Sequence, residues 1–279
     1  MNNLYDNHNH SQFSFDGKKT SVEDSAKAAY SKGLGGICFS DHCDFYAPPL
    51  KFTFENYEPE LFDVLLQQEE IDRIRTVMGK QDRPFEILKG IEIGMYEESH
   101  DQIRQILSEN SFDQVIASVH YIEQSDPYYG EFYDGKDHKT AYGKYLETIY
   151  REMTWMKDFD IMGHYDYIAR YAPYPEATIR YREFSDIFDE MFRFLIREGK
   201  ALEINTKSYQ ETGNRITTLD PDILKRYKEL GGEIISLGSD SHDAAMVGKD
   251  FARYAGLLKA AGFRWSAHYR NRKLVQLPL

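Results

Sequence analysis

The sequence has few cysteines and no long hydrophobic run. Cys38 and Cys43 are its only two cysteines among 279 residues, which is too few for a disulfide framework and fits a reducing compartment. No segment approaches the roughly 18 consecutive apolar residues that cross a bilayer. The opening stretch MNNLYDNHNH has neither the basic nor the apolar region of a secretory signal. We therefore expect a cytoplasmic protein with no membrane partner.

The sequence also lacks an excess of positive charge. Its formal net charge is -12 at pH 7. Proteins that hold nucleic-acid phosphates usually present a basic face, so no nucleic-acid partner is expected. A small anionic substrate remains compatible with this charge if metal ions supply the local positive charge.

Segments with helical periodicity alternate along the chain with short apolar segments of strand length. Helices are predicted at residues 21–32, 61–78, 101–109, 141–157, 183–198, 221–230 and 249–261. Strands are predicted at residues 4–5, 35–40, 85–94, 114–119, 159–163, 201–205 and 233–238. This alternation predicts an α/β fold with a parallel sheet and helices outside it. Its length favours closure into a barrel related to the TIM barrel, with an open doubly wound sheet as the alternative.

The whole chain, residues 1–279, is expected to form one domain, because no linker, repeat or low-complexity tract interrupts the pattern. Residues 265–279 are expected to form a C-terminal tail that packs on the barrel. The long loops at residues 43–60, 121–140 and 206–219 are expected at the active-site face. In the helix predicted at 61–78, one apolar stripe is expected to contain Phe62, Leu65, Leu66, Ile71, Ile74 and Met78.

Side chains that bind metal ions stand at the C-terminal ends of most predicted strands. In chain order, the strand-end residues are His8, His10, His42, Glu92, His120, His164, Asn205, Asp240 and His242. The C-terminal ends of parallel barrel strands meet at one end of the barrel, so we expect these side chains to converge. A single histidine at a strand end is more often structural, but six at one rim favour a metal centre. The other three histidines, His100, His138 and His268, are expected to be surface or core residues.

The chemistry of this set predicts several transition-metal ions. Residues i and i+2 of a strand point to the same face, so His8 and His10 can reach one ion. Imidazoles with a few carboxylates suit Zn, Mn or Fe rather than Mg or Ca. The set exceeds the needs of one tetrahedral ion, so two or three divalent ions are expected, with Glu92 as the natural bridging carboxylate.

The ordered motifs HNH, SDH, GIE, SVH, GH and SDSH resemble those of the PHP (polymerase and histidinol phosphatase) superfamily. The flanking segments HNHSQFSFDG, GHYDYIARY, ALEINT, GSDSH and VGKDFARYAGLLKAAGF resemble histidinol-phosphatases of the PHP type over nearly the whole chain. The resemblance implies a distorted (β/α)7 barrel with a trinuclear centre.

The resemblance also implies which residues hold each ion. The implied ligands are His8, His10, Glu92 and Asp240 for the first ion, Glu92, His120 and His164 for the second, and Asp16, His42 and His242 for the third. Asp16 stands where some relatives carry histidine.

The activity that the resemblance implies is hydrolysis of a small phosphorylated substrate, L-histidinol phosphate, to L-histidinol and phosphate in histidine biosynthesis. A hydroxide that bridges two ions would attack phosphorus, with no side-chain nucleophile. The first alternative is a PHP phosphoesterase that acts on nucleotides or nucleic-acid ends, and the second is a noncatalytic metal-binding module. The sequence leaves open whether the chain forms a homo-oligomer.

Residues outside the ligand set are expected to bind substrate. Arg170 is the first choice to meet the phosphate, with Arg197 as the second and Asn205 beside them, and the catalytic set is Asp240, His242, His42 and Arg170. The candidates for the leaving-group acid are Asp41, Asp44 and Asp166, each more typical of a residue that orients an imidazole. Loop side chains that could recognise the amine and imidazole of the substrate are Phe45, Tyr46, Phe52, Phe54, Glu55, Tyr57, Glu58, Tyr121, Glu123, Tyr128, Tyr129, Glu131, Phe132 and Tyr133.

Overall fold

The computed structural model describes residues 3–17, 19–45, 61–79, 81–175, 177–209, 211–212 and 215–279. Most of the predicted loop at 43–60 therefore lies outside the described residues. The loop candidates outside the described residues are Tyr46, Phe52, Phe54, Glu55, Tyr57 and Glu58. Among the residues that are described, no helix is both long and apolar enough to span a membrane.

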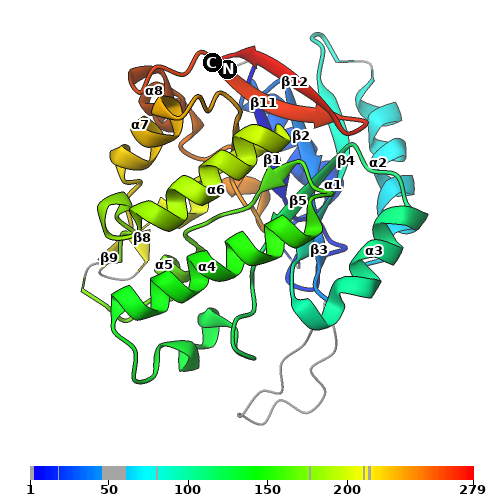
Figure 1. Cartoon of the computed structure of the whole chain (residues 1–279). Coiled ribbons are helices and arrows are strands. Elements are labelled where there is room, and N and C mark those ends of the chain that lie inside the picture. Colours follow the sequence, from blue (N-terminus) through cyan, green and yellow to red (C-terminus); the bar gives the residue numbers. More distant parts are fainter. Residues whose placement is uncertain are drawn as a thin grey trace.

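Seven parallel strands form the centre of the molecule (Figure 1). In their order across the sheet they are β1 (Tyr5–Asn9), β2 (Gly36–Phe39), β4 (Glu86–Gly94), β5 (Gln114–Ser118), β6 (Ile161–Met162), β7 (Ala201–Asn205) and β10 (Ile235–Gly238). The short strand β3 (His42–Cys43) also pairs in parallel with β4. The predicted parallel α/β sheet is confirmed, and its strand order is the chain order that a barrel requires.

The sheet curves until its first strand lies beside its seventh, at a junction that we call the seam. At the C-terminal ends of β1 and β10, the Asp240 backbone N–H donates to the His8 carbonyl at 2.8 Å, and the His10 N–H donates to the Ser241 carbonyl at 2.9 Å. At the other end of the seam, β11 (Trp265–Arg270) pairs with β10 instead, between Ser236 and Ala267. The barrel is therefore distorted: the seam is joined at one end and occupied by an additional strand at the other.

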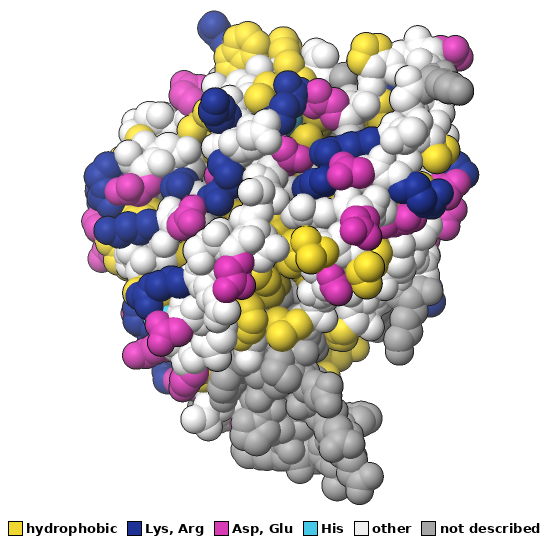
Figure 2. Space-filling model, turned by 90° about the vertical axis from the view of Figure 1, so that its right-hand side faces the viewer, with side chains coloured by type: hydrophobic (Ala, Val, Ile, Leu, Met, Phe, Trp, Pro, Cys, Tyr) yellow, Lys and Arg dark blue, Asp and Glu magenta, His cyan; other side chains and the backbone are white. Residues whose placement is uncertain are grey.

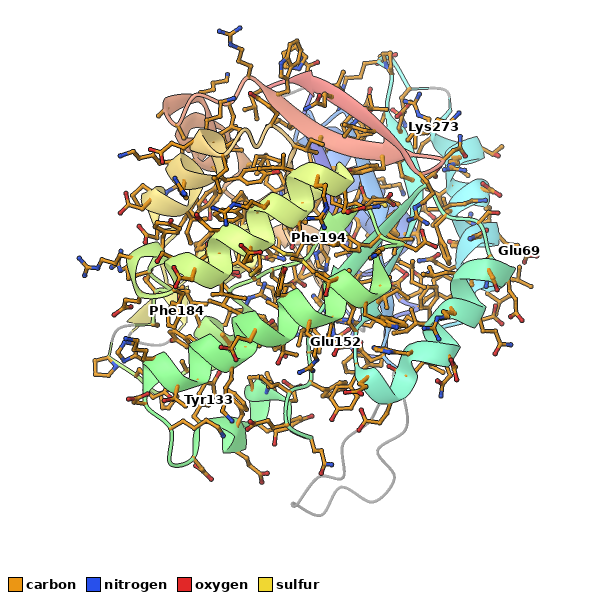
Figure 3. All side chains as sticks on the ribbon, in the orientation of Figure 1. Glu69, Tyr133, Glu152, Phe184, Phe194 and Lys273 are labelled. Atoms are coloured by element: carbon orange, nitrogen blue, oxygen red, sulfur yellow. The ribbon has the colours of Figure 1, made fainter. Side chains whose placement is uncertain are left out.

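Residues 265–279 form a hairpin that extends the sheet. Strand β11 pairs in antiparallel fashion with β12 (Lys273–Pro278), whose first residue, Lys273, is labelled in Figure 3. His268 of β11 is buried and stacks on Tyr5 of β1, with ring centroids 3.7 Å apart. The segment expected as a tail is thus part of the ten-stranded sheet.

Helices cover the outside of the sheet (Figure 1). They are α1 (Val22–Ser31), α2 (Val64–Met78), α3 (His100–Glu109), α4 (His138–Met156), α5 (Tyr167–Tyr171), α6 (Ser185–Glu198), α7 (Pro221–Glu229) and α8 (Phe251–Ala260). The 3-10 turns are η1 (Glu97–Ser99), η2 (Pro127–Tyr129), η3 (Glu131–Tyr133), η4 (Tyr181–Glu183), η5 (Thr206–Tyr209) and η6 (Ala244–Met246), and a small hairpin joins β8 (Glu211–Thr212) to β9 (Arg215–Ile216). Ser21 caps helix α1, because its hydroxyl accepts from the Asp24 N–H at 3.0 Å.

The main hydrophobic core fills the space between helices and sheet. Phe194 of α6 stacks on Phe159, which precedes β6, and both are almost fully buried. Glu152, labelled with Phe194 in Figure 3, is a buried carboxylate of α4 that accepts a 2.8 Å hydrogen bond from His100. His100 also stacks on Trp155, so its partners lie in α4 and not in a strand-end cluster.

The apolar stripe expected for α2 is wrong in part. Leu65 and Leu66 are 67% and 53% exposed. The buried face is Val64, Gln67, Ile71, Ile74 and Met78. Gln67 is buried where the apolar pattern predicted a leucine. Its burial is tolerated because its amide donates a hydrogen bond to Asp41 at 2.7 Å.

Charged side chains of both signs are interspersed over the face shown in Figure 2. Helix α2 contributes Arg73, which pairs with Glu70 at 2.7 Å, and Arg75, which pairs with Asp72 at 3.0 Å. Glu69 points outward from the same helix in Figure 3 and is exposed. Pairs of this kind form a solvated surface and contribute little to stability.

Candidate metal centre

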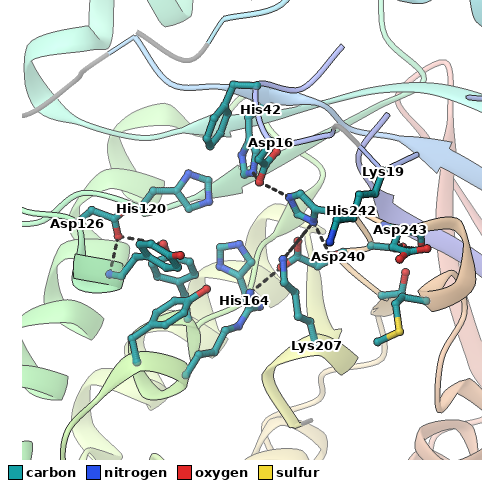
Figure 4. A pocket seen from close by; sticks show the side chains of 18 of the residues that line it. Asp16, Lys19, His42, His120, Asp126, His164, Lys207, Asp240, His242 and Asp243 are labelled. Atoms are coloured by element: carbon teal, nitrogen blue, oxygen red, sulfur yellow. Dashed lines mark hydrogen bonds and ion pairs between the residues drawn. The ribbon is translucent and has the colours of Figure 1, made fainter. Parts of the chain in front are cut away.

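The strand-end side chains surround one cavity of about 730 Å³ at the C-terminal end of the barrel (Figure 4). Its lining includes His42, His120, His164, Asp240 and His242. The expected convergence of these residues is therefore what the structure shows. Convergence follows from topology, because every parallel strand delivers its C-terminal residue to the same rim.

Glu92 of β4 lies at the centre of the cluster and is fully buried. Its Oε2 atom is 3.2 Å from His8 Nε2, 3.5 Å from His10 Nε2 and 3.0 Å from His42 Nδ1. Three imidazoles thus face one carboxylate oxygen: His8 of β1, His10 directly after β1, and His42 of β3. Such an oxygen is suited to sharing cations with these rings.

The other oxygen of Glu92 faces a second pair of imidazoles. Oε1 is 3.3 Å from His120 Nε2 and 3.0 Å from His164 Nε2. The Ser118 hydroxyl also donates to this oxygen at 2.7 Å, which fixes the orientation of the carboxylate. Because its two oxygens serve different histidines, Glu92 has the geometry of a bridging ligand.

A second carboxylate links β10 to the same cluster. Asp240 Oδ1 is 3.3 Å from His10 Nε2 and 3.6 Å from His242 Nδ1. Asp16, in the loop after β1, approaches from the opposite side, with Oδ2 2.7 Å from His242 Nε2 and 3.8 Å from His42 Nε2. The aspartate expected to complete the cluster from this loop therefore lies beside two of the histidines.

The donor atoms fit metal ions. Among the described residues, His8 Nε2, His10 Nε2, Glu92 Oε2 and His120 Nε2 are buried and have no hydrogen-bond partner. Such atoms are costly unless something binds them. The sets whose donor atoms lie within 4.8 Å of one another are His8, His10 and Asp240; His8, Glu92 and His164; His42, Glu92 and His120; and His10, His42 and His242. Nitrogen and carboxylate donors of this kind suit zinc and related ions.

The charges of the cluster favour cations. Burial acts to raise the pKa of Glu92, yet the imidazoles of His8, His120 and His42 outweigh it and hold that pKa well below its ordinary value. Burial likewise opposes ionisation of Asp240, but Lys207 and Arg170 keep its pKa well below the ordinary value. Both carboxylates are therefore ionised at neutral pH, and each can offer charged oxygen atoms as ligands to a cation.

Further carboxylates orient the imidazoles from outside the cluster. His8 Nδ1 donates to Glu203 at 2.7 Å, and His120 Nδ1 donates to Asp44 at 2.9 Å. Each bond fixes the tautomer in which Nε2 is free to bind a metal ion. Asp44 was expected in this role, whereas Glu203 was missed although a charged residue within the apolar strand ALEIN is a signal of a buried partner.

The other two expected orienting residues bind elsewhere. Asp41 accepts from the Ser11 hydroxyl and from Gln67, each at 2.7 Å, and so anchors the loop after β1. Asp166 accepts from Ser208 at 2.7 Å. Neither carboxylate makes a hydrogen bond to an imidazole within the described part of the chain.

Three cationic side chains line the cavity: Lys19, which is exposed, and Arg170 and Lys207, which contact Asp240. Arg170 of α5 is almost fully buried; it donates from NH1 to Asp240 at 2.7 Å and from Nε to Ser208 at 2.9 Å. Lys207 of η5, which the sequence interpretation missed, lies 3.1 Å from both Asp240 Oδ1 and His242 Nδ1. Both reach the cavity from loops that follow strands.

The structure does not bring Arg197 to the cavity. Its side chain is 64% exposed and pairs with Glu198 at 2.8 Å. The reason is topological: Arg197 ends the helix that precedes β7, and that helix end lies at the N-terminal rim of the barrel. Asn205 is buried and is not part of the cavity lining; its amide lies 3.4 Å from Asp240, an expected metal ligand, and 3.3 Å from Glu203, which orients His8.

The loop after β5 supplies part of the aromatic wall that was expected. Tyr121, Tyr128 and Tyr129 line the cavity, together with Tyr167 and Tyr171, which were not predicted. Several other loop candidates lie elsewhere. Phe132 and Tyr133 are buried in the core, Phe45 packs partly buried against it, Glu123 pairs with Lys144 and Lys136, and Glu131 begins η3 outside the cavity lining.

Comparisons with known proteins agree with this architecture. Residues 6–207 match the model of the PHP domain family. The histidinol-phosphatase of Lactococcus lactis is 34% identical over 270 residues, covering 96% of this chain and 95% of the relative. A probable histidinol-phosphatase of Clostridium acetobutylicum is 33% identical over 248 residues, covering 89% and 90%. The crystal structure of the Lactococcus lactis histidinol phosphate phosphatase complexed with zinc, L-histidinol and phosphate has a TM-score of 0.84 and 32% identity, covering 98% of each chain.

Proposed function

The chain belongs to the PHP domain family, and from this membership we propose that it is a metal-dependent phosphatase that hydrolyses L-histidinol phosphate to L-histidinol and phosphate. The observation that carries the proposal is the set of buried metal-binding atoms around Glu92 that have no hydrogen-bond partner. The chain also aligns over 98% of its length with the relative whose crystal structure contains zinc, L-histidinol and phosphate. The product of this reaction assigns the enzyme to histidine biosynthesis.

We infer two or three divalent ions, with zinc as the first candidate. His8, His10, Glu92 and Asp240 would hold one ion, and Glu92, His120 and His164 a second. The distances of 3.0 to 3.5 Å from the two oxygens of Glu92 to His8, His10, His120 and His164 support Glu92 as the ligand that these two ions share. A third ion would be held by Asp16, His42 and His242, whose side chains meet at the mouth of the cavity.

The side chains of the cavity would have different roles in the reaction. Ions held by these ligands would supply an activated water at neutral pH and would offset the charge of the phosphoryl group. Arg170 and Lys207 project donors into the same cavity and would bind phosphate oxygens. Both cations contact Asp240, so a bound phosphate would share them with that carboxylate. Glu203 and Asp44 hold His8 and His120 in the tautomer that leaves Nε2 free.

The proposal is tested by substrate comparison. Protein loaded with zinc or manganese is assayed for phosphate release from L-histidinol phosphate, a 3′,5′-bisphosphonucleotide and an oligonucleotide with a terminal phosphate. We expect kcat/KM to be at least about 100-fold higher for L-histidinol phosphate. Equal or higher efficiency on either nucleotide substrate would refute the proposed substrate.

A pair of histidine variants tests the metal centre. His120→Ala removes a partnerless donor and is expected to lower the number of bound ions and abolish most of the turnover. His138→Ala is the matched control, because His138 lies on α4 and contacts Glu183 at 3.5 Å, away from the cluster. Metal content is measured by mass spectrometry of the purified protein. Full turnover by His120→Ala would show that the reaction does not need this cluster.

A further inference from the structure

Two carboxylates of the cavity wall, Asp126 and Asp243, have no part in the proposed metal centre, and Asp126 lies apart from the cationic side chains Lys19 and Lys207. Asp126 follows β5 in the chain, caps the short helix η2 and lines the cavity. Its Oδ1 atom accepts from the Tyr128 backbone N–H at 2.8 Å and from the Tyr167 hydroxyl at 3.0 Å. Both hydrogen bonds use the same oxygen. Within the described part of the chain, Oδ2 accepts no hydrogen bond and no lysine or arginine pairs with Asp126.

A row of tyrosines connects Asp126 to the metal ligands. The ring of Tyr167 lies 5.4 Å from that of His120 and 5.3 Å from that of His164, measured between centroids. Tyr171 packs on Tyr167 at 5.2 Å, and Tyr128 packs on Tyr171 at 5.1 Å. The carboxylate therefore stands one tyrosine away from the proposed phosphate site. Aromatic faces beside a carboxylate are suited to a cationic or heteroaromatic group.

Lys19 and Lys207 lie on the side of the cavity away from Asp126, together with Asp240 and Asp243. Figure 4 shows Asp126 beyond His120, apart from Lys207 and His242. The side with Lys207 and Arg170 suits a phosphate. On the other side, burial raises the pKa of Asp126 to about 6, so the carboxylate is ionised at neutral pH although its environment disfavours the charge. A cation placed there would relieve this cost.

We propose that Asp126, with Tyr167 and Tyr128 beside it, binds the cationic nitrogen end of the substrate and so makes the enzyme selective for phosphomonoesters of amino or imidazolyl alcohols. The inference rests on the proposed function, because it assigns the recognition of the alcohol part of that substrate. Asp126 would be a specificity residue that contacts the alcohol, while the phosphate is bound on the other side of the cavity.

The test uses Asp126→Asn in the metal-loaded protein. Asparagine keeps one carbonyl oxygen, which can accept from both Tyr128 and Tyr167, and replaces only the second oxygen and the charge. We expect kcat/KM for L-histidinol phosphate to fall by about 10- to 100-fold. For p-nitrophenyl phosphate, which carries no cation, we expect less than a twofold change. Asp134→Asn is the matched control, since Asp134 is an exposed carboxylate in the same loop that does not line the cavity.

Two further substrates test which nitrogen group of L-histidinol phosphate contacts Asp126, the amine or the imidazole. 2-Aminopropyl phosphate keeps the amine and lacks the imidazole, whereas 3-(imidazol-4-yl)propyl phosphate keeps the imidazole and lacks the amine. A loss in Asp126→Asn on the first assigns the contact to the ammonium group, and a loss on the second assigns it to the imidazolium. A loss on neither overturns the inference. Equal losses on p-nitrophenyl phosphate and L-histidinol phosphate also overturn it, because the role of Asp126 would then be general.

The outcome is separable from the proposed function. Should the wild-type protein fail to hydrolyse L-histidinol phosphate, the proposed function fails. In that case, kcat/KM on 2-aminoethyl phosphate is divided by kcat/KM on ethyl phosphate for each protein. A lower ratio in Asp126→Asn than in wild type would support the present inference, and equal ratios would overturn it. Titration calorimetry measures the Kd for L-histidinol without turnover, and we expect this Kd to be about 10- to 100-fold higher in Asp126→Asn. Asp126→Ser, which retains a capping hydroxyl for η2, repeats the comparison if the asparagine variant is unstable.

Discussion

Replacement of Glu203 by glutamine should weaken metal binding although Glu203 touches no ion. This carboxylate is buried in β7 and has three partners. Oε1 accepts from His8 Nδ1 at 2.7 Å, and Oε2 accepts from the His164 backbone N–H at 2.7 Å and from the Asn205 amide at 3.3 Å. The carboxylate can accept from all three groups because both of its oxygens are acceptors.

Glutamine cannot reproduce this pattern in either orientation. With its oxygen toward His8, its NH2 group faces the His164 N–H, and that buried donor loses its acceptor at a cost of about 1–3 kcal/mol. With its NH2 group toward His8, the amide donates to Nδ1. The ring proton then moves to Nε2, which blocks the atom that faces Glu92. Either orientation disturbs one ligand, and loss of such an orienting partner typically weakens metal affinity by about 10- to 100-fold.

The assay is a competition between Glu203→Gln and a chromogenic zinc chelator, followed by thermal denaturation of the loaded protein. Glu69→Gln is the matched control, because Glu69 is an exposed residue of α2. We expect the Kd for zinc to rise by about 10- to 100-fold in Glu203→Gln and to stay unchanged in Glu69→Gln. Equal zinc affinity in Glu203→Gln and wild type would refute the claim that Glu203 sets the tautomer of His8.

Three other predictions follow from contacts described above. Arg170→Lys loses the fork that joins Asp240 to the loop and should lower kcat/KM on L-histidinol phosphate by about 10- to 100-fold; a loss below twofold would contradict a phosphate-binding role. Burial lowers the pKa of His268 to about 4, so below about pH 6.5 this histidine is protonated in the unfolded chain but still neutral in the folded protein. The free energy of unfolding should therefore fall by up to about 3 kcal/mol as the pH drops from about 6.5 to 4. Urea titrations across this range should show a smaller decline for His268→Gln, and equal declines would disprove the assignment. Ile74→Ala should cost about 2–5 kcal/mol and Leu65→Ala no more than about 0.5, as measured by urea unfolding; comparable costs at the two positions would restore the apolar stripe predicted from sequence.

The metal cluster could be predicted because it depends on local sequence and on topology alone. His120 follows the end of β5, and His164 follows the end of β6. In a parallel barrel that position is sufficient to bring both side chains to one rim. The gathering of these side chains at one rim needed no knowledge of side-chain packing, whereas the partner of His8, Glu203, was missed.

Other features depend on partners that are distant in the chain, and no local pattern reveals them. Gln67 can be buried because Asp41 accepts its hydrogen bond. The apolar pattern does not contain this contact, so it wrongly predicted that Leu65 is part of the buried face. Asp126 resembles an ordinary loop aspartate until Tyr167, on another βα loop, donates to it. Lys207 reaches the cavity because the chain turns through η5 directly after β7, and turn geometry is not encoded in hydrophobic periodicity.

The seam gives the metal centre a mechanical role besides a chemical one. The first and last parallel strands are tied by backbone bonds only near their C-terminal ends, and that is where His8 and His10 on one side meet Asp240 on the other. An ion held by all three side chains would act as a cross-link between β1 and β10. Because it binds only when the two strands are together, its binding free energy adds to the work of separating them. Depletion of the ion would therefore loosen the barrel at this one junction first, and the supply of metal would control both turnover and the lifetime of the fold.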